Sequence, residues 1–261
     1  MNTARTRRYK IAGIQITSLV AFLVFWQGSV ASRILNPVLF PTPVTIVQNF
    51  YIVLRSPGVA NTIIQGLLIT LLAFSASLAF GLVAGLWLGG SEFRKGVSGA
   101  YLVLFNATPK MAFLPVFALA FGLGFSYQFW FGFIIAAIPM ALNTMIAVAS
   151  VPVSLRTTAR IMGATSTKIY AKVVIPYLTP TLLGSARIIF GTVFGGILIA
   201  EEFSGTTGFG YLVVKDTSFF AIVPLYVTIV TASLVGIGSY LTLLAIERHF
   251  TRWTRARMQQ T

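Results

Sequence analysis

The chain has 261 residues, of which 56% are hydrophobic and only 9% are charged, and its mean hydropathy is +0.86. A water-soluble domain of this composition lacks the polar residues to cover its surface, so a soluble enzyme or nucleic-acid-binding protein is excluded despite the net charge of +14. The absence of cysteine excludes disulfide and thiolate chemistry, and a single histidine, His249, cannot form a Cys/His metal cluster. We expect an all-α integral membrane protein that binds neither metal nor cofactor itself.

Six apolar runs are long enough to cross a membrane. We predict transmembrane helices over residues 11–30, 61–90, 99–122, 127–149, 180–200 and 221–246. A cleaved signal peptide is the alternative for the first run, but the run is long for such a segment and no clean small-residue cleavage site follows it. Residues 31–60 contain four prolines and predict an outer loop with a short surface helix over residues 44–54. The whole chain, residues 1–261, then forms one membrane domain.

The helix predicted over residues 61–90 carries glycine at every fourth position, at Gly81, Gly85 and Gly89. This spacing leaves a narrow face that a neighbouring helix can approach closely. The general abundance of glycine in membrane helices is the alternative explanation. The spacing therefore favours a close helix contact here without requiring one.

The basic residues are distributed unevenly between the predicted loops. Fourteen of them fall in the N-terminal ten residues, the 91–98 turn, the 156–172 segment and the tail after residue 247, whereas the opposite side holds only Arg33, Arg55 and Lys215. Loops rich in lysine and arginine stay in the cytoplasm. We therefore expect both termini to be cytoplasmic.

The segment over residues 151–187 interrupts the apolar runs and contains five basic residues and no acid. A polar interruption of this length lies in water or against a partner. Residues 153–162 predict a short helix, which Gly163 can end in a left-handed conformation. Ser166 can begin a second helix, which Pro176 is expected to stop. Two short helices that meet at a glycine bend are thus predicted.

The second of these short helices has two distinct sides. Lys168 and Lys172 lie on one face at a spacing of four residues, and Ile169 and Val173 lie on an adjacent face. One side can therefore pack against membrane helices while the other contacts a partner. A basic loop lying on anionic lipid headgroups is the alternative.

Ala159, Gly163 and the sequence Val174-Ile175-Pro176 have a spacing that resembles the cytoplasmic signature loop, the EAA loop, of permease subunits of binding-protein-dependent ABC importers. Four further segments occur in the order typical of the sulfonate, taurine, nitrate and bicarbonate branch of that family. These segments read LFPTPVTIV, PKMAFLPVFALAFGLG, IPMALNT and EEFSGTTGFGYLV. The resemblance covers nearly the whole chain.

The resemblance implies a type I ABC importer permease fold in a bacterial inner membrane. It also implies a second permease copy, two cytoplasmic ATPase subunits that bind ATP and magnesium, a periplasmic or lipid-anchored solute-binding protein, and no enzymatic activity in this chain. In such importers residues 151–179 would form the coupling loop that each ATPase contacts. The residues carried over to that role are Thr157, Thr158, Ala159, Gly163, Ala164, Lys168, Lys172 and Pro176.

This loop departs from the family pattern in its charge. Thr157 stands where the family has its glutamate, Thr158 replaces the first alanine, and Pro152 and Ser154 stand where acids are usual. We expect the ATPase to present a surface less basic than usual, or the chain to pair with a second, more typical permease.

Lys110 follows Pro109 within the helix predicted over residues 99–122, which Pro109 and Pro115 interrupt. A lysine at the centre of a membrane helix costs about 2.5–3.5 kcal/mol. Its position is about 16 Å along the helix from Gly99, which is near mid-depth. We expect Lys110 to face the solute pathway and to attract an anion; a buried pair or an interface position are the alternatives.

Three further residues are candidates for the pathway. Asn143, beside Thr144, matches a polar position of the family, although a buried hydrogen bond between helices explains the pair nearly as well. Arg187 lies near the inner end of its helix, where a side chain reaching to the interface is the alternative. Glu201, with Glu202, lies at the outer end of the same helix. Three roles are open for it: part of an outer gate, a contact for the binding protein, or a solvated acid.

A secondary transporter or channel is the competing function, and a non-transporting scaffold is a third. Secondary transporters usually carry acids at mid-membrane and are often built from inverted repeats. None of the five acids is predicted at mid-membrane here and no inverted repeat is visible, so the sequence does not favour a secondary transporter. The resemblance favours a small anion as the solute, with a vitamin precursor or an aromatic acid as the alternative.

Overall fold

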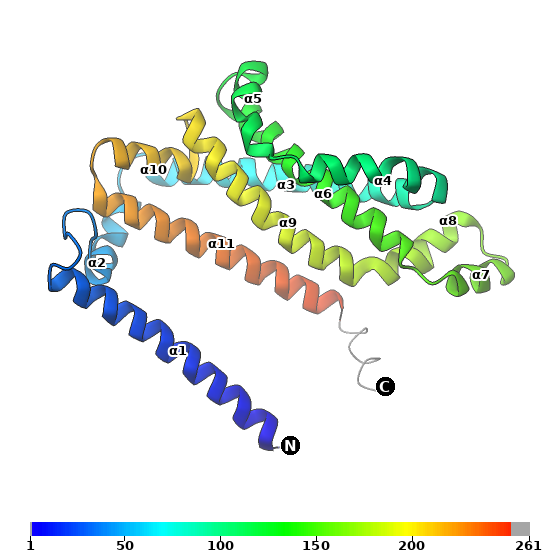
Figure 1. The fold of residues 1–261 in the computed structure, drawn as a ribbon, viewed down its shortest axis with the longest axis horizontal. Coiled ribbons are helices and arrows are strands. Elements are labelled where there is room, and N and C mark those ends of the chain that lie inside the picture. The colour runs from blue at the N-terminus through cyan, green and yellow to red at the C-terminus, as the bar shows by residue number, and fades with distance from the viewer. Residues whose placement is uncertain (1, 252–261) are drawn as a thin grey trace. The chain divides into compact units, whose positions relative to one another are not determined.

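The computed structural model describes residues 2–251, which are helical or form short connections (Figure 1). The basic residues counted beyond Thr251 lie outside the described residues. The elements are α1 (Asn2–Ala31), α2 (Pro43–Leu54), α3 (Val59–Gly89), α4 (Glu92–Ala107), the 3-10 helix η1 (Lys110–Phe113), α5 (Leu114–Phe121), α6 (Phe125–Ala149), α7 (Val153–Ile161), α8 (Ser166–Ile169), the π-helix η2 (Tyr170–Val174), α9 (Ile175–Ser204), α10 (Gly208–Ser218) and α11 (Ile222–Phe250).

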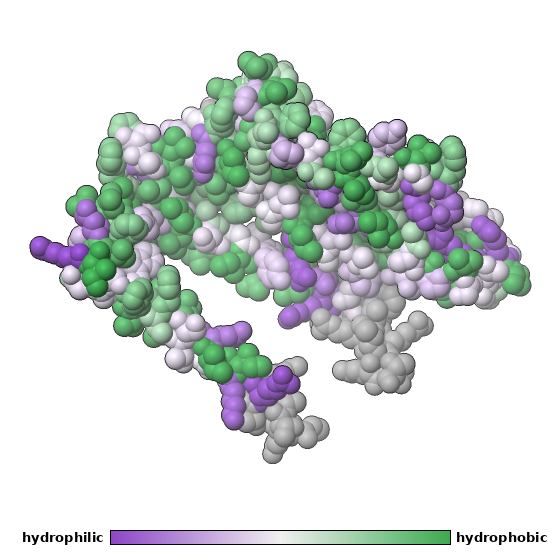
Figure 2. Space-filling view, in the orientation of Figure 1, coloured by the Kyte–Doolittle hydropathy of each residue, from purple (hydrophilic) through white to green (hydrophobic). Residues whose placement is uncertain are grey.

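Five of the described helical stretches are long and apolar enough to cross a membrane, and a bent pair of helices supplies a sixth crossing if it counts as one span. The five stretches are Tyr9–Ala31, Val59–Gly89, Phe125–Ala149, Ser166–Phe203 and Ile222–Phe250. Many large apolar side chains on these helices are exposed (Figure 2), as lipid-facing side chains are in a membrane protein. With the bent pair counted as one span, the number of crossings is the six that the sequence predicts.

The bent pair consists of α4 and the η1–α5 segment, which meet at an angle of 78°. Pro109 has no N–H for helical hydrogen bonding, and it restricts Thr108 to the extended conformation that this residue adopts (φ −65°, ψ 133°). Pro115 lies in the first turn of α5, where its missing N–H costs nothing. The chain therefore changes direction at Pro109, whereas Pro115 is accommodated inside α5.

The structure divides into two compact units. The smaller comprises residues 1–61 and 212–231, and holds α1, α2 and the adjoining ends of α3, α10 and α11. In this unit Trp26 contacts Tyr226 with 6.1 Å between the ring centroids. Thr42 caps α2 by accepting a hydrogen bond from the N–H of Thr45, which confirms the predicted short helix after the first crossing.

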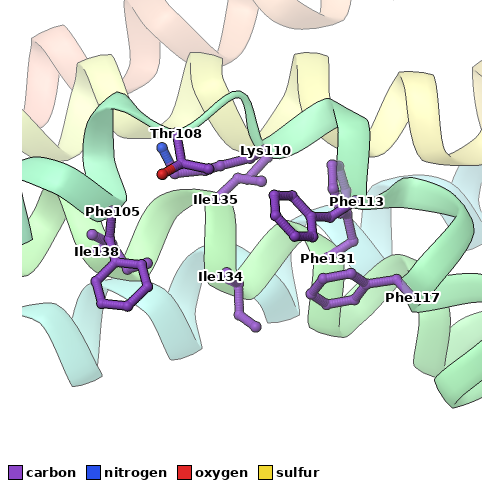
Figure 3. A pocket seen from close by; sticks show the side chains of 9 residues that line it. All are labelled: Phe105, Thr108, Lys110, Phe113, Phe117, Phe131, Ile134, Ile135 and Ile138. Carbon is purple, nitrogen blue, oxygen red and sulfur yellow. The ribbon is translucent and has the colours of Figure 1, made fainter.

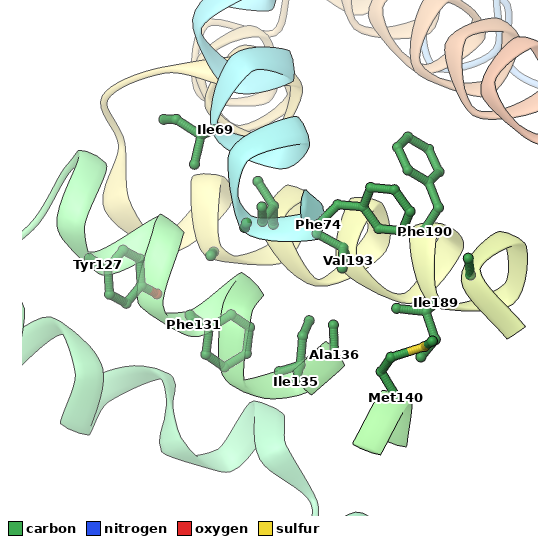
Figure 4. Close-up of a cluster of buried hydrophobic side chains, with 14 of the residues drawn as sticks. Ile69, Phe74, Tyr127, Phe131, Ile135, Ala136, Met140, Ile189, Phe190 and Val193 are labelled. Atoms are coloured by element: carbon green, nitrogen blue, oxygen red, sulfur yellow. The ribbon is translucent and has the colours of Figure 1, made fainter. Parts of the chain in front are cut away.

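The larger unit comprises residues 62–211 and 232–261, and its core lies where α3, α6 and α9 pack together (Figure 4). Phe131 and Met140 of α6 are completely or almost completely buried there. Phe74 of α3 meets Phe190 of α9 edge to face, with 5.3 Å between the ring centroids. This core fixes α6 and α9, the two helices that the candidate site joins.

The predicted glycine face of α3 is confirmed, and its neighbour is α6. A side-chain atom at Gly81 would meet Met140, one at Gly85 would meet Thr144, and one at Gly89 would lie 2.8 Å from the Cβ of Val148. Ser77 on the same side of α3 donates a hydrogen bond to the Phe133 carbonyl at 3.0 Å. The small residues therefore let the two backbones approach within a distance that any larger side chain would prevent.

Candidate functional site

The polar segment between α6 and α9 begins with the short helix α7 and a bend at Gly163, as predicted. Helix α7 ends at Ile161, and Gly163 follows it with a φ of +79°. The N–H of Gly163 donates to Arg160 O and the N–H of Ala164 to Ala159 O, which is the pattern of a left-handed helix end. Ser166 then begins α8, and the residue before it, Thr165, is extended (φ −69°, ψ 159°).

The inner side of this segment is anchored in a second hydrophobic cluster. Ile169 and Val174 are buried there against Val148 and Val151 at the end of α6. Arg156 of α7 donates a hydrogen bond to the carbonyl oxygen of Val148. The segment is therefore fixed to α6 rather than hanging freely in water.

The outer side of the segment is exposed and carries both apolar and basic groups. The side chains of Val153, Ile161 and Met162 are 76%, 82% and 81% exposed. Figure 2 shows polar side chains gathered at the end of the larger unit that carries α7 and α8. The exposed residues among those expected to contact the ATPase are Thr157, Thr158, Gly163, Lys168 and Lys172, whereas Ala159, Ala164 and Pro176 are half-buried.

Pro176 does not stop the second short helix, so this part of the prediction is wrong. The helix continues from α8 through η2 into α9, and Ser166–Phe203 forms one apolar helical stretch of 38 residues. In the π-helix η2 each hydrogen bond joins residues five positions apart instead of four. Pro176 follows η2 and lies in the first turn of α9, a position where its missing N–H is tolerated. The site is thus connected to α9 without a break.

A cavity of ≈ 390 Å³ lies beside the bend between α4 and α5 (Figure 3). Its wall comes from α4, η1, α5 and α6. Lys110 is the one charged residue among its nine lining residues. These are Phe105, Thr108, Lys110, Phe113, Phe117, Phe131, Ile134, Ile135 and Ile138.

The ammonium group of Lys110 lies at the end of α4. Its Nζ donates a hydrogen bond to the carbonyl oxygen of Asn106 at 2.8 Å. This carbonyl belongs to the last turn of α4, where the negative end of the helix dipole favours a cation. Figure 3 shows the ammonium end pointing toward Thr108. The side chain is half-buried, so it retains hydrogen-bonding capacity toward the cavity.

The other three residues predicted for the pathway lie elsewhere. Asn143 is half-buried on α6 and does not line the cavity. Its neighbour Thr144 is completely buried, and no hydrogen-bond partner for its hydroxyl is found among the described residues. A buried hydrogen bond between helices therefore does not account for Thr144, which instead packs against Gly85.

Glu201 is buried in the last turn of α9, with a side-chain environment unlike that of a solvated acid. Only 2% of the residue is exposed. The N–H groups of Phe209 and Gly210 at the start of α10 donate to its carboxyl, the latter at 3.0 Å. Gly66 and Gly208 approach the same carboxyl so closely that a Cβ at either position would overlap it. Glu201 thus ties α10 to α9, while Glu202 is half-buried.

Arg187 of α9 forms an ion pair with Glu247 of α11, with 3.3 Å between Nη1 and Oε2. The two side chains are 20% and 22% exposed, and the guanidinium also lies over the Tyr240 ring at 5.0 Å. Sequence reasoning did not pair these residues because they are 60 positions apart. The sequence also did not place phenylalanines around Lys110. Phe117 and Phe131, on α5 and α6, are separated from Lys110 along the chain by other apolar residues.

The family is decided by a comparison with known protein families. The profile of the family described as binding-protein-dependent transport system inner membrane component matches residues 77–255. The chain belongs to this family. It is therefore a multi-pass membrane transport component, and the ATPase of such an importer resides on separate subunits.

Individual relatives agree with this assignment. The chain is 24% identical to the taurine transport system permease protein TauC of Escherichia coli K12, over 92% of this chain and 89% of that protein. It is 26% identical to the riboflavin transport system permease protein RibX of Chloroflexus aurantiacus, over 92% and 90%. A chain of the inward-facing MetNI methionine ABC transporter superposes with a TM-score of 0.63 and 21% identity, over 76% of this chain and 100% of that one. The predicted ABC importer permease fold is confirmed.

In this permease the Arg187–Glu247 pair permits a test of stability. Replacing Arg187 by methionine leaves a half-buried carboxylate without its cation, so we expect the free energy of unfolding to fall by about 1–3 kcal/mol. The double variant Arg187→Met/Glu247→Gln should lose less, because no charge is left unpaired. Denaturant titration of the purified permease measures both values.

The matched control is the pair between Lys95 and Glu92, whose side chains are 33% and 87% exposed. Lys95→Met should change the free energy of unfolding by less than about 1 kcal/mol, because a surface pair contributes little. Equal losses in the single and double Arg187 variants would show that the unpaired carboxylate of Glu247 is not the cause of the loss in Arg187→Met.

Proposed function

We propose that this permease forms half of the solute pathway of an ABC importer, and that residues 151–179 couple ATP hydrolysis by partner subunits to uptake. A second permease copy forms the other half, and the solute is a small anion of the sulfonate, taurine or nitrate kind delivered by a binding protein. The observation that carries the proposal is the two-sided segment formed by α7 and α8.

The exposed side of this segment has the character of a protein interface. Three strongly exposed apolar residues, Val153, Ile161 and Met162, lie in or directly after α7. Basic residues at Arg160, Lys168 and Lys172 are exposed on the same short segment. Exposed apolar side chains with charged ones beside them are typical of a surface that a protein partner covers.

The anchored side supports the transmission of movement. Because α8, η2 and α9 form one helical stretch, a displacement of α8 moves the adjoining end of α9 with it. The hydrophobic cluster around Val148 and Val174 attaches the same segment to α6. Movement imposed by an ATPase on the exposed side would reach both helices of the core as a rigid-body shift.

The orientation follows from the same assignment. With residues 151–179 facing the ATPase, the other loops rich in basic residues lie in the cytoplasm, and both termini lie there as well. The loop after α9, where Glu201 ties down α10, then lies on the side that receives the binding protein.

The test is the substitution Ile161→Asp in the permease co-expressed with its ATPase. An acid at this exposed apolar position introduces a desolvation cost at the interface. We expect co-purified ATPase and ATP hydrolysis stimulated by the binding protein to fall about tenfold, which corresponds to about 1.4 kcal/mol. The yield and the elution profile of the permease should not change, because Ile161 is 82% exposed.

The control is Ser56→Asp, which places the same charge on an exposed residue of the connection between α2 and α3. This variant should retain ATPase binding. If Ile161→Asp retains both ATPase binding and stimulated ATP hydrolysis, the segment does not couple the permease to an ATPase and the proposal fails.

A further inference from the structure

We infer that the cavity beside Lys110 is a solute subsite for a small organic monoanion with an aromatic or branched apolar body, and not for a small inorganic anion or a zwitterion. This inference rests on the proposed function and narrows its solute class to organic sulfonates and similar organic anions, which leaves out nitrate and taurine. The cavity has three properties that together define such a ligand: its charge, its apolar wall and its size.

The charge of the cavity is positive and is supplied by one residue. Among the described residues that line it, Lys110 is the only charged one and none is acidic. One of the three ammonium donors is used by the carbonyl of Asn106, at 2.8 Å, which leaves donors for a ligand. The hydroxyl of Thr108 donates to Leu104 O at 3.0 Å, so its proton is already used and is not offered to an anion. A single carboxylate or sulfonate at Lys110 matches this arrangement.

The rest of the wall is apolar and largely aromatic. Four phenylalanines, at positions 105, 113, 117 and 131, and three isoleucines on α6 complete it. Phe117 and Phe131 are packed edge to face with 5.6 Å between centroids, so this part of the wall is preorganised. A ligand with an apolar body buries surface here, at about 25 cal/mol per Å². Nitrate has no such body, and the ammonium group of taurine would be desolvated with no acid to pair with it.

The size of the cavity favours one small molecule. Its volume of ≈ 390 Å³ lies at the lower end of the range of about 300–1,000 Å³ that is usual for small-molecule sites. A phospholipid shares the chemistry of an anion joined to an apolar body but is larger than this volume. The bend at Pro109 creates the space, because it turns α5 away from α4 and exposes the phenylalanines on both sides of Lys110 (Figure 3).

The absence of cysteine from the chain makes a direct test possible. Ile138→Cys places a thiol in the cavity wall, and the rate at which N-ethylmaleimide labels it in the permease–ATPase complex reports occupancy. We expect benzenesulfonate to slow labelling severalfold, whereas nitrate, taurine and the neutral benzenesulfonamide do not. Ile146→Cys on the same helix, outside the cavity, should be labelled at the same rate with every probe.

Variants at Lys110 test the role of its charge. Lys110→Met should raise the benzenesulfonate concentration needed for half-protection by about tenfold, and Lys110→Arg should restore most of the protection. Protection that is unchanged in Lys110→Met, or protection by nitrate or taurine equal to that by benzenesulfonate, overturns the inference.

Two further results separate this inference from its alternatives. If phosphatidylglycerol in nanodiscs protects Ile138→Cys and benzenesulfonate adds nothing in nanodiscs of phosphatidylcholine alone, the cavity is a lipid site and the inference is wrong. If the complex binds its ATPase and hydrolyses ATP but no probe protects the thiol, only the subsite is refuted, whereas failure to bind any ATPase refutes the proposed function.

Discussion

Replacing Gly85 by leucine is expected to abolish recovery of folded permease from the membrane. The first added atom, a Cβ, would overlap the Cβ of Thr144 and lie 2.6 Å from the backbone oxygen of Ala141. Neither group can yield easily, since Thr144 is completely buried and Ala141 O belongs to the backbone of α6. A strained insertion costs about 1–3 kcal/mol even where neighbours adjust, and leucine adds three more atoms. Gel filtration of detergent-extracted protein and its thermal midpoint measure the loss.

The control for Gly85→Leu is Gly96→Leu on α4. No atom of the described residues lies within 4 Å of a Cβ at Gly96, so the residue tests the effect of losing a glycine without a clash. Its thermal midpoint should stay the same or rise, because leucine has the higher helix propensity. Gly85→Ala should be intermediate. A folded and stable Gly85→Leu would show that α3 and α6 do not pack through this face.

A second large effect is expected for Gly208→Ala at the start of α10. Gly208 has a φ of +90°, where alanine is strained by about 1–3 kcal/mol. A Cβ there would also overlap the carboxyl group of Glu201, which is held by Gly210 and is 2% exposed. Because the two costs add, we expect a loss of at least about 3 kcal/mol in the free energy of unfolding and little folded protein.

Two variants separate the clash from the backbone strain. Gly205→Ala has the same kind of backbone strain, with a φ of +63°, but nothing within 4 Å of its Cβ, so it should cost only about 1–2 kcal/mol. Glu201→Ala removes the clashing carboxyl, so Gly208→Ala should cost less in that background than in the natural chain. Equal costs in both backgrounds would show that Glu201 does not occupy the space beside Gly208.

Glu201 illustrates a contact that the sequence does not reveal. The sequence places it at the end of an apolar helix, where a solvated acid and a gate residue are equally compatible with its neighbours. The structure buries it because Gly66 and Gly208 leave space for a carboxyl, Gly210 lets α10 approach the backbone of α9, and the start of α10 provides N–H groups. The glycine-rich loop is visible in the sequence, but Gly66 lies 135 residues earlier, and its approach depends on helix packing.

Pro109 and Pro176 also separate what the sequence predicts from what packing decides. Pro109 and Pro176 both lack an N–H, so the sequence predicts an interruption at each. At Pro109 the chain bends by 78° and opens the cavity beside Lys110. At Pro176 the helix continues, because a π-helical turn precedes the proline and the buried cluster around Val174 holds the segment in place. Local chemistry identifies the weak point, and packing decides its outcome.

The sequence by itself determined the membrane class, the number of crossings, the glycine bend at Gly163 and the importer family. These follow from hydropathy, residue type and spacing, which act over a few turns of helix. Only the tertiary structure decided that Glu201 is buried, that Arg187 pairs with Glu247, and that phenylalanines from four elements surround Lys110. Each of these contacts joins segments separated by several to 135 residues. The distances between the contacting side chains depend on how closely the helices pack, and residue spacing within one helix does not encode that packing.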